Sequence, residues 1–201
     1  MAKFSGATGN YHTFNVAENS IDWPKLNKKF INSYKVEQNP ITTQIEPHDW
    51  IAEILNSISR LNNILLDLSQ DMWIYISNDT YELKLIKNEV GSSTMPHKVN
   101  PIDFENAEGN LGISNALNNH FSDKLTRSRL QRDLSDSTVL RNIGSTYGYS
   151  YLGISSLVKG LNKITPNKKS IFNELDNNWE VLTEAVQTLS LIHISEPTRP
   201  S

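Results

Sequence analysis

A long run of apolar residues at helical spacing limits the fold of this chain more than any other feature. Between Pro47 and about Asn78 the apolar side chains recur in steps of three and four, which indicates an amphipathic helix and not a strand. They are Ile51, Ile54, Leu55, Ile58, Leu61, Ile64, Leu65, Leu68, Met72 and Ile76. Such a helix is longer than the average globular helix, and helices of that length usually belong to bundles.

Two further helical stripes follow along the chain. We expect one helix to start at Pro101 with Asn100 as its cap, and a third long helix to start between Asp133 and Ser137. The apolar residues of these two helices are Leu111, Ile113, Leu117 and Phe121, and then Val139, Leu140, Ile143, Tyr147, Tyr151, Leu152, Ile154 and Leu157. No segment shows sustained alternation with period two, so the sequence predicts an all-α fold built as a long-helix bundle.

Composition excludes several classes of protein and suggests that the core is shared. Apolar residues make up 37% of the chain and glycine adds only nine residues, which is below the roughly 45–50% typical with glycine counted. Some apolar surface is therefore expected to pack on partner subunits. The net charge of −3 argues against nucleic-acid binding, and the lack of cysteine rules out disulfides and Cys-based metal sites. With no signal peptide and no run of roughly 20 apolar residues, we expect a soluble intracellular protein.

The segment from Gly91 to Pro101 combines hydroxyls, a cation and a helix start. A serine hydroxyl such as that of Ser92 acts as a base only when cations and backbone N–H groups stabilise its alkoxide. Lys98 supplies a cation, and the helix that begins at Pro101 offers N–H groups to an anion. These residues could abstract a proton next to a carboxylate. From spacing alone, a surface turn before a capped helix is at least as good an interpretation.

The residues of this segment, GSSTMPHKVNP, resemble the GSSxMPxKxNP signature of the fumarase/aspartase superfamily at every fixed position. Four flanking stretches are similar to the bacterial adenylosuccinate lyase family, and the resemblance covers residues 2 to about 188. These stretches are residues 39–49, 102–110, 131–142 and 175–182.

The resemblance implies a carbon–nitrogen lyase of purine biosynthesis that needs no cofactor and no metal. Members of the family eliminate fumarate from adenylosuccinate to give AMP, and from the succinylated carboxamide nucleotide SAICAR to give AICAR. It also implies a cytoplasmic homotetramer whose sites combine residues of three subunits. By the same resemblance, residues 1–165 form part of the central helical bundle domain and residues 166–189 begin a C-terminal helical domain.

The resemblance assigns roles to nine residues of this chain. Ser92 is expected to be the base that takes the Cβ proton. Ser93, Lys98 and Asn100 are expected to contact the succinyl part, and Gln44 and Asn106 to contact substrate. Arg132, Ser137 and Arg141 match the region that holds the nucleotide phosphate. A spacing of i, i+4 near a helix N-terminus would favour a phosphate at Ser137 and Arg141, although a lone arginine is more often a solvated surface charge.

None of the five histidines, at positions 12, 48, 97, 120 and 193, lies in the Thr-His-Gly type segment that carries the family's general acid. That segment would precede this chain, so the chain alone is expected to be inactive. Two alternatives stay open, namely a helical scaffold or oligomerisation fragment without activity, and another fumarate-releasing enzyme such as argininosuccinate lyase or fumarase. Residues 190–201 resemble a translated sequencing adapter and are expected to be a non-native tail, with a natural disordered tail as the alternative.

Overall fold

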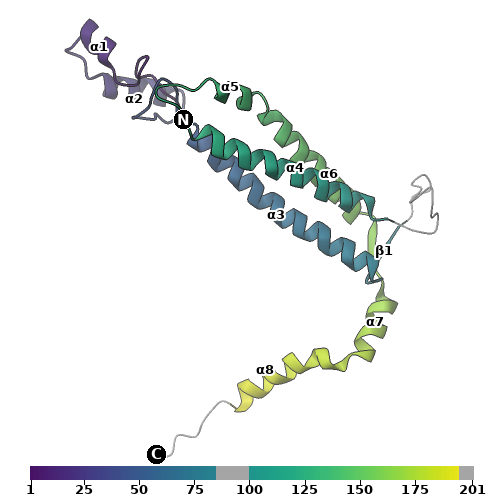
Figure 1. Cartoon of the computed structure of the whole chain (residues 1–201). Coiled ribbons are helices and arrows are strands. Elements are labelled where there is room, and N and C mark those ends of the chain that lie inside the picture. Colours follow the sequence, from purple (N-terminus) through teal and green to yellow (C-terminus); the bar gives the residue numbers. More distant parts are fainter. Residues whose placement is uncertain (85–99, 195–201) are drawn as a thin grey trace, which may run out of the picture.

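The computed structural model describes residues 1–84 and 100–194, and within them the fold is helical, as the sequence predicts (Figure 1). Three long helices, α3, α4 and α6, lie side by side as a bundle, with α1 and α2 beyond one end and α7 and α8 beyond the other. The helices are α1 His12–Ala17, α2 Trp23–Ser33, α3 Asp49–Ser77, α4 Ile102–Leu125, α5 Ser135–Leu140, α6 Ile143–Leu161, α7 Lys168–Asn177, the 3-10 helix η1 Trp179–Leu182 and α8 Thr183–Ile194.

Helix α4 is the centre of the bundle and packs against both α3 and α6, which contact each other much less. It runs antiparallel to α3, because Ser122 of α4 donates to the Ala52 carbonyl while the Trp73 indole N–H donates to Glu105. Helix α6 in turn runs antiparallel to α4 (Figure 1). The bundle therefore has two ends. One carries the strands β1 and β2 and is called the β end below, and the other carries α5 and is called the α5 end.

The apolar core is divided into two clusters, one at each end of the bundle. At the α5 end Leu55, Phe121, Leu125 and Val139 are buried together. At the β end Phe104, Ala107 and Leu157 are buried and the α3 residues Leu65, Leu68, Met72 and Ile76 pack on them. The α3 residues in this core belong to the stripe predicted from the sequence, which explains why the helix forms against α4.

A layer of buried polar side chains separates the two apolar clusters. The Asn62 amide of α3 donates to the hydroxyls of Ser150 at 2.9 Å and Ser114 at 3.2 Å, and Ser114 and Ser150 lie 2.8 Å apart. Thr146 of α6 donates to the side-chain oxygen of Asn118 at 2.6 Å. Because these bonds join all three helices at defined heights, the layer fixes the register of the bundle.

The β end is closed by two short strands, β1 Tyr81–Leu83 and β2 Ile164–Pro166, which pair antiparallel with Leu83 opposite Ile164. Strands of three residues are too short to show a period of two, so the sequence pattern does not indicate them. The Thr165-Pro166-Asn167 segment predicts the start of a short helix, and beyond β2 the Asn167 side chain accepts from Ser170 N–H and caps α7. Helices α7 and α8 then lead away from the bundle (Figure 1).

Asp22 followed by Pro24 predicts the start of a helix, with Asp22 as its N-cap. The structure confirms this start for α2, since the Asp22 side chain accepts from Lys25 N–H and Pro24 lies in the first turn. The predicted start of α4 is wrong by one residue, because Pro101 occupies the cap position and Asn100 precedes it. The polar, basic residues 122–134 predict a connection after this helix. Instead, α4 continues into this stretch through Leu125, since Ser122 and Leu125 are buried against the bundle.

The third long helix predicted from Asp133 onward is interrupted. It forms a short α5 that ends at Leu140, followed by α6 from Ile143, with Arg141 and Asn142 between them. Neither residue of the break, Arg141 or Asn142, is a proline or glycine, so no helix-breaking residue indicates it in the sequence. The interruption moves Arg141 from the first turn of a long helix to the junction of two helices.

Candidate functional site

The predicted site residues lie at opposite ends of the bundle. Asn100 and Asn106 lie at the β end, whereas Gln44, Arg132, Ser137 and Arg141 lie at the α5 end. The predicted site residues Ser92, Ser93 and Lys98 lie outside the described residues. Helix α4 separates the two groups, and its 24 residues at about 1.5 Å per residue give a length of about 36 Å. The structure therefore brings together residues within each group and keeps the two groups apart.

Two loops meet at the α5 end and bring Gln44 next to the Arg132 segment. The Gln44 backbone N–H donates to the Gln131 carbonyl at 3.2 Å. The Lys3 ammonium donates to the Gln44 carbonyl, and burial lowers the pKa of Lys3. Two segments that are 87 residues apart in sequence, and that carry separate parts of the family resemblance, are thus neighbours in space.

The N-terminal loop approaches the same place. The Ser5 and Thr42 hydroxyls lie 3.2 Å apart, and Gly9 has a φ of +76° with its α-carbon facing the Thr42 carbonyl. A Cβ at position 9 would lie 2.0 Å from that oxygen, so only glycine allows the two loops to pack this closely. The first loop of the chain therefore supports the segment that carries Gln44.

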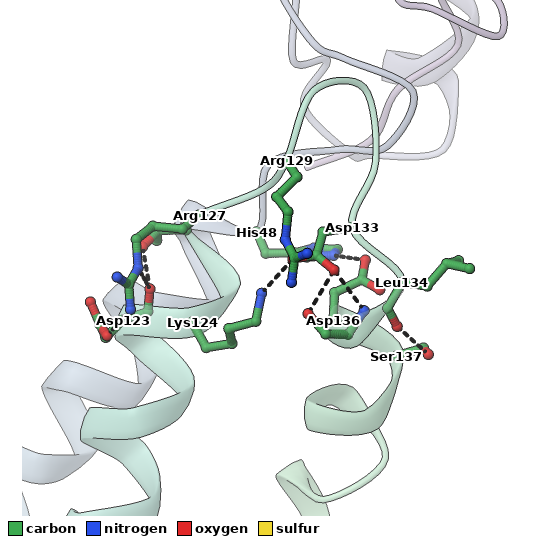
Figure 2. Close-up of polar contacts among 11 residues, drawn as sticks. His48, Asp123, Lys124, Arg127, Arg129, Asp133, Leu134, Asp136 and Ser137 are labelled. Carbon is green, nitrogen blue, oxygen red and sulfur yellow. Dashed lines mark hydrogen bonds and ion pairs between the residues drawn. The ribbon is translucent and has the colours of Figure 1, made fainter.

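Asp133 organises the loop that leads into α5 (Figure 2). Its carboxylate accepts from the Ser135 N–H at 3.0 Å and from the Ser135 hydroxyl at 2.8 Å. Lys124 and Arg129 lie 3.2 and 3.3 Å from its second oxygen. These bonds, led by the Ser135 N–H, hold the pKa of Asp133 well below its usual range.

His48 lies at the start of α3 and faces carboxylates from two directions (Figure 2). Its Nδ1 is 3.3 Å from Oε2 of Glu46, an oxygen that accepts a hydrogen bond from the Trp50 indole at 3.0 Å. Its Nε2 is 4.0 Å from Oδ2 of Asp136, a buried residue of α5. His48 thus joins the loop that carries Gln44 to the short helix that carries Ser137.

Lys3, His48 and Asp133 also belong to this end, although they are not among the site residues predicted from the sequence. For Asp133 a signal was present, because an Asp followed two residues later by Ser is typical of an Asx turn. For Lys3 and His48 no local pattern existed, because their partners come from distant segments.

The arginines at the α5 end differ in whether a carboxylate neutralises their charge. Arg127 pairs with Asp123 and Arg129 with Asp133. Arg132 and Arg141 are exposed, and among the described residues their guanidinium groups have no carboxylate partner. Two unpaired guanidinium groups can each offer a fork of N–H donors to a phosphate or carboxylate.

Ser137 lies one turn before Arg141, and the Arg141 N–H donates to its carbonyl at 3.3 Å. The i, i+4 relation is therefore kept in spite of the break between α5 and α6. The Ser137 hydroxyl donates to the Leu134 carbonyl at 2.8 Å and keeps its lone pairs for another donor.

At the β end, Asn100 and Asn106 flank the start of α4. The Ile102 N–H donates to the Asn100 carbonyl at 2.8 Å, and Pro101 is buried. Asn106 is exposed on the second turn, with its carbonyl bonded to the Asn110 amide. The described part of the β end therefore contributes uncharged amides, and its lysines Lys159 and Lys163 pair with Asp103.

Within residues 1–84 and 100–194, no group of three or more His, Cys, Asp or Glu side chains is arranged to hold a metal ion. None of the described helices is long and apolar enough to cross a membrane.

Comparison with known proteins identifies the family. Residues 1–113 match the family model described as Lyase, and residues 128–197 match the model described as Adenylosuccinate lyase C-terminal. The first match covers more than half of the 201 residues, so the chain belongs to the lyase family.

Within the lyase family, the curated relatives that this chain matches are adenylosuccinate lyases. The chain is 57% identical over 188 residues to the adenylosuccinate lyase of Legionella pneumophila (strain Corby), 54% over 189 residues to that of Buchnera aphidicola subsp. Schizaphis graminum, and 50% over 189 residues to that of Escherichia coli (strain K12). Each match covers 94% of this chain and 41% of the relative, so the chain spans about two fifths of their length. The predicted resemblance to adenylosuccinate lyases is confirmed.

Proposed function

We propose that the whole protein represented by this chain is an adenylosuccinate lyase that releases fumarate from adenylosuccinate and from SAICAR. The observation that carries the proposal is the contact between Gln44 and Gln131, which unites two of the segments that resemble the family. The identities of 50–57% to adenylosuccinate lyases support it over argininosuccinate lyase or fumarase. A cytoplasmic location is part of the same proposal.

In this proposal the α5 end holds the nucleotide phosphate. Arg132 and Arg141 supply positive charge that no described carboxylate neutralises, and Ser137 adds a hydroxyl between them in sequence. Gln44, held beside Gln131, contacts substrate at the same end. Charge-assisted hydrogen bonds to a phosphate are about twice as strong as neutral ones, so these arginines would dominate phosphate affinity.

The elimination itself is assigned to residues of the signature segment, by resemblance. Ser92 takes the proton from Cβ of the succinyl group, and the electron pair of that C–H bond forms the new double bond of fumarate. The C–N bond breaks, and a general acid outside this chain's motifs protonates the leaving nitrogen. Ser93, Lys98 and Asn100 bind the succinyl carboxylates, with Asn106 nearby in sequence.

We further propose that the complete site needs several copies of the chain. The two groups of site residues are separated by the length of α4, about 36 Å, which is far longer than a nucleotide. One copy must therefore contribute its α5 end and another its β end to the same substrate. Exposed apolar residues on the bundle, including Ile64, Trp73 and Tyr151, are suited to contacts between copies in the expected homotetramer.

The phosphate assignment is tested in a full-length chimera, in which residues 1–188 replace the matching segment of the Legionella relative. Arg132→Met and Arg141→Met are each expected to raise KM for adenylosuccinate about 10- to 100-fold, because each removes a charge-assisted hydrogen bond. Arg60→Met is the control, since Arg60 is an exposed arginine in the middle of α3. Equal KM values for all three variants would contradict the assignment.

The 201-residue chain alone is proposed to release no measurable fumarate from adenylosuccinate, because the acid is expected outside it. Release at a rate near that of the chimera would overturn this proposal. If the chimera is inactive although it folds, the helical scaffold interpretation gains support and the lyase proposal fails.

A further inference from the structure

A buried ion pair at the β end connects the start of α4 to the start of β2. Helix α4 follows residues 85–99 in the sequence, and β2 lies beside Lys84, the residue that precedes them. The Lys163 side chain is 7% exposed, and its Nζ lies 2.5 Å from Oδ2 of Asp103 in the first turn of α4. The exposed Lys159 reaches the other oxygen of Asp103, with a separation of 3.2 Å. Both oxygens of this carboxylate are therefore engaged by α6 and the residues that follow it.

Besides its side-chain ion pair, Lys163 makes backbone hydrogen bonds with Lys84 and Gly160. Its carbonyl accepts from the Lys84 N–H at 2.8 Å, directly next to the pairing of Leu83 with Ile164. Its own N–H donates to the Gly160 carbonyl at 2.9 Å, at the end of α6. One residue thus contacts Lys84 through its backbone and Asp103 through its side chain.

Asp103 is tightly linked to Asn100. The Asn100 carbonyl accepts from Ile102 N–H, and the Pro101 carbonyl accepts from Phe104 N–H at 3.0 Å and Glu105 N–H at 3.2 Å. A displacement of the first turn of α4 would therefore move Asn100 with it. Of the three residues expected to contact the succinyl part of the substrate, Asn100 is the one that the structure describes.

Close packing makes the ion pair possible. A Cβ at Gly160 would lie 2.9 Å from the Phe104 ring and 3.2 Å from Asp103 Cβ, so these two α4 side chains pack directly on the α6 backbone here. Buried ion pairs are often no more stabilising than apolar side chains of the same size. Their advantage is that they are directional, and loss of one partner leaves an uncompensated charge.

We propose that Asp103 and Lys163 are positioning residues, which hold Lys84 and Asn100 in a fixed relation so that Asn100 is presented to substrate in one geometry. The inference rests on the lyase function proposed above. The pair acts through Lys84 and Asn100 and does not itself touch substrate. A misplacement of about 1 Å in such a support can lower turnover by up to about 100-fold.

The first test compares Lys163→Met with Lys159→Met, which removes the exposed lysine from the same carboxylate. In the full-length chimera, Lys163→Met is expected to lower kcat about 10- to 100-fold while KM changes by less than about threefold, because phosphate binding at the α5 end is unaffected. Lys159→Met is expected to keep kcat within about twofold, as is usual for exposed ion pairs. Equal kcat values for the two variants would overturn the proposal.

A second variant separates positioning from simple loss of stability. Asp103→Leu combined with Lys163→Met removes the uncompensated charge, so the melting temperature is expected to return to that of the parent. Its kcat is expected to stay at least about tenfold below the parent, because an apolar contact lacks the directionality of the ion pair. Full recovery of kcat in this variant would show a merely structural role and refute the proposal.

A readout without substrate keeps this inference distinct from the proposed function. In the 201-residue chain, Lys163→Met is expected to speed hydrogen exchange at the amides of Lys84, Phe104 and Glu105 by about tenfold or more, with little change at Ser114 in the middle of α4. Unchanged exchange at Lys84 would refute the positioning role even if the chimera is active. If instead the parent chimera lacks activity while exchange changes as expected, only the lyase assignment fails.

Discussion

At the β end of the bundle Lys159 and Lys163 share the carboxylate of Asp103, whereas at the α5 end the exposed Arg132 and Arg141 have no carboxylate partner among the described residues. The two Asp103 oxygens are both paired. By contrast, Glu46 Oε1 and Asp136 Oδ1 at the α5 end are buried without a hydrogen-bond donor among the described residues. This difference indicates that the charged side chains at the β end stabilise the fold. Some of the charged side chains at the α5 end have no partner among the described residues and are available to a ligand or a neighbouring chain.

The two ends also differ in how tightly the helices pack. In the β half of the bundle, Gly153 and Gly160 let α6 approach Leu111 and Phe104 directly. At the α5 end the helices are joined by loops, whose position depends on polar contacts of Asp133 and His48. Tight packing tolerates substitution poorly, so stability measurements can test this contrast.

The largest effect is expected from removing a buried ring at either end. Phe104→Ala is expected to lower the free energy of unfolding by about 5 kcal/mol and Phe121→Ala by about 3 kcal/mol, because the closely packed β end has less room to collapse into the cavity. Chemical denaturation of the chain measures both. A larger loss for Phe121→Ala would reverse the proposed packing contrast.

A smaller effect is expected from adding one methyl group to α6. Gly153→Ala would place its Cβ 2.6 Å from Leu111 Cγ and 3.2 Å from the Ala107 carbonyl, which should cost about 1–3 kcal/mol. Gly148→Ala is the matched control, because nothing lies within 4 Å of its Cβ position. That substitution should instead stabilise the chain by about 0.5–1 kcal/mol through helix propensity. Thermal unfolding that gives both variants the same sign would disprove the close approach.

Disrupting the polar layer between the two ends is expected to lower the free energy of unfolding by a comparable or smaller amount. Asn62→Ala removes the donor that joins Ser114 and Ser150, and should cost about 1–3 kcal/mol because buried acceptors lose their partner. Asn56→Ala, at an exposed position of α3, should change stability by less than about 0.5 kcal/mol. If the two variants unfold at the same denaturant concentration, the layer does not link the ends.

The smallest effect is expected from Asp133, and it depends on pH. Its pKa is depressed in the folded chain, so its contribution to stability is present above its ordinary pKa of about 3.9 and is lost as the pH falls towards the folded value. Asp133→Asn should therefore lower the melting temperature at pH 7, and the difference from the parent should shrink below about pH 4. A difference that grows on acidification would contradict the assigned contacts.

Much of the fold could be predicted because apolar spacing determines which face of each helix is buried. The stripe from Ile51 to Ile76 gave α3, and Asp22 and Asn167 marked helix starts that the structure confirms. The break at Arg141 could not be predicted, since no glycine or proline marks it and the period continues across it. Likewise the residues of the polar layer look like surface residues in sequence, and only packing against two other helices buries them.

For the candidate site, the sequence by itself determined which residues are expected to carry the chemistry, because a charged or hydroxyl side chain is defined by its type and its motif. Only the tertiary structure decided that the described members of this set lie in two groups at opposite ends of the bundle, since α4 runs unbroken between Asn100 and Arg132. It also decided which cations are neutralised. Lys163 and Arg132 are both single positive charges in the sequence, and their difference arises from the carboxylate that the fold brings to one of them.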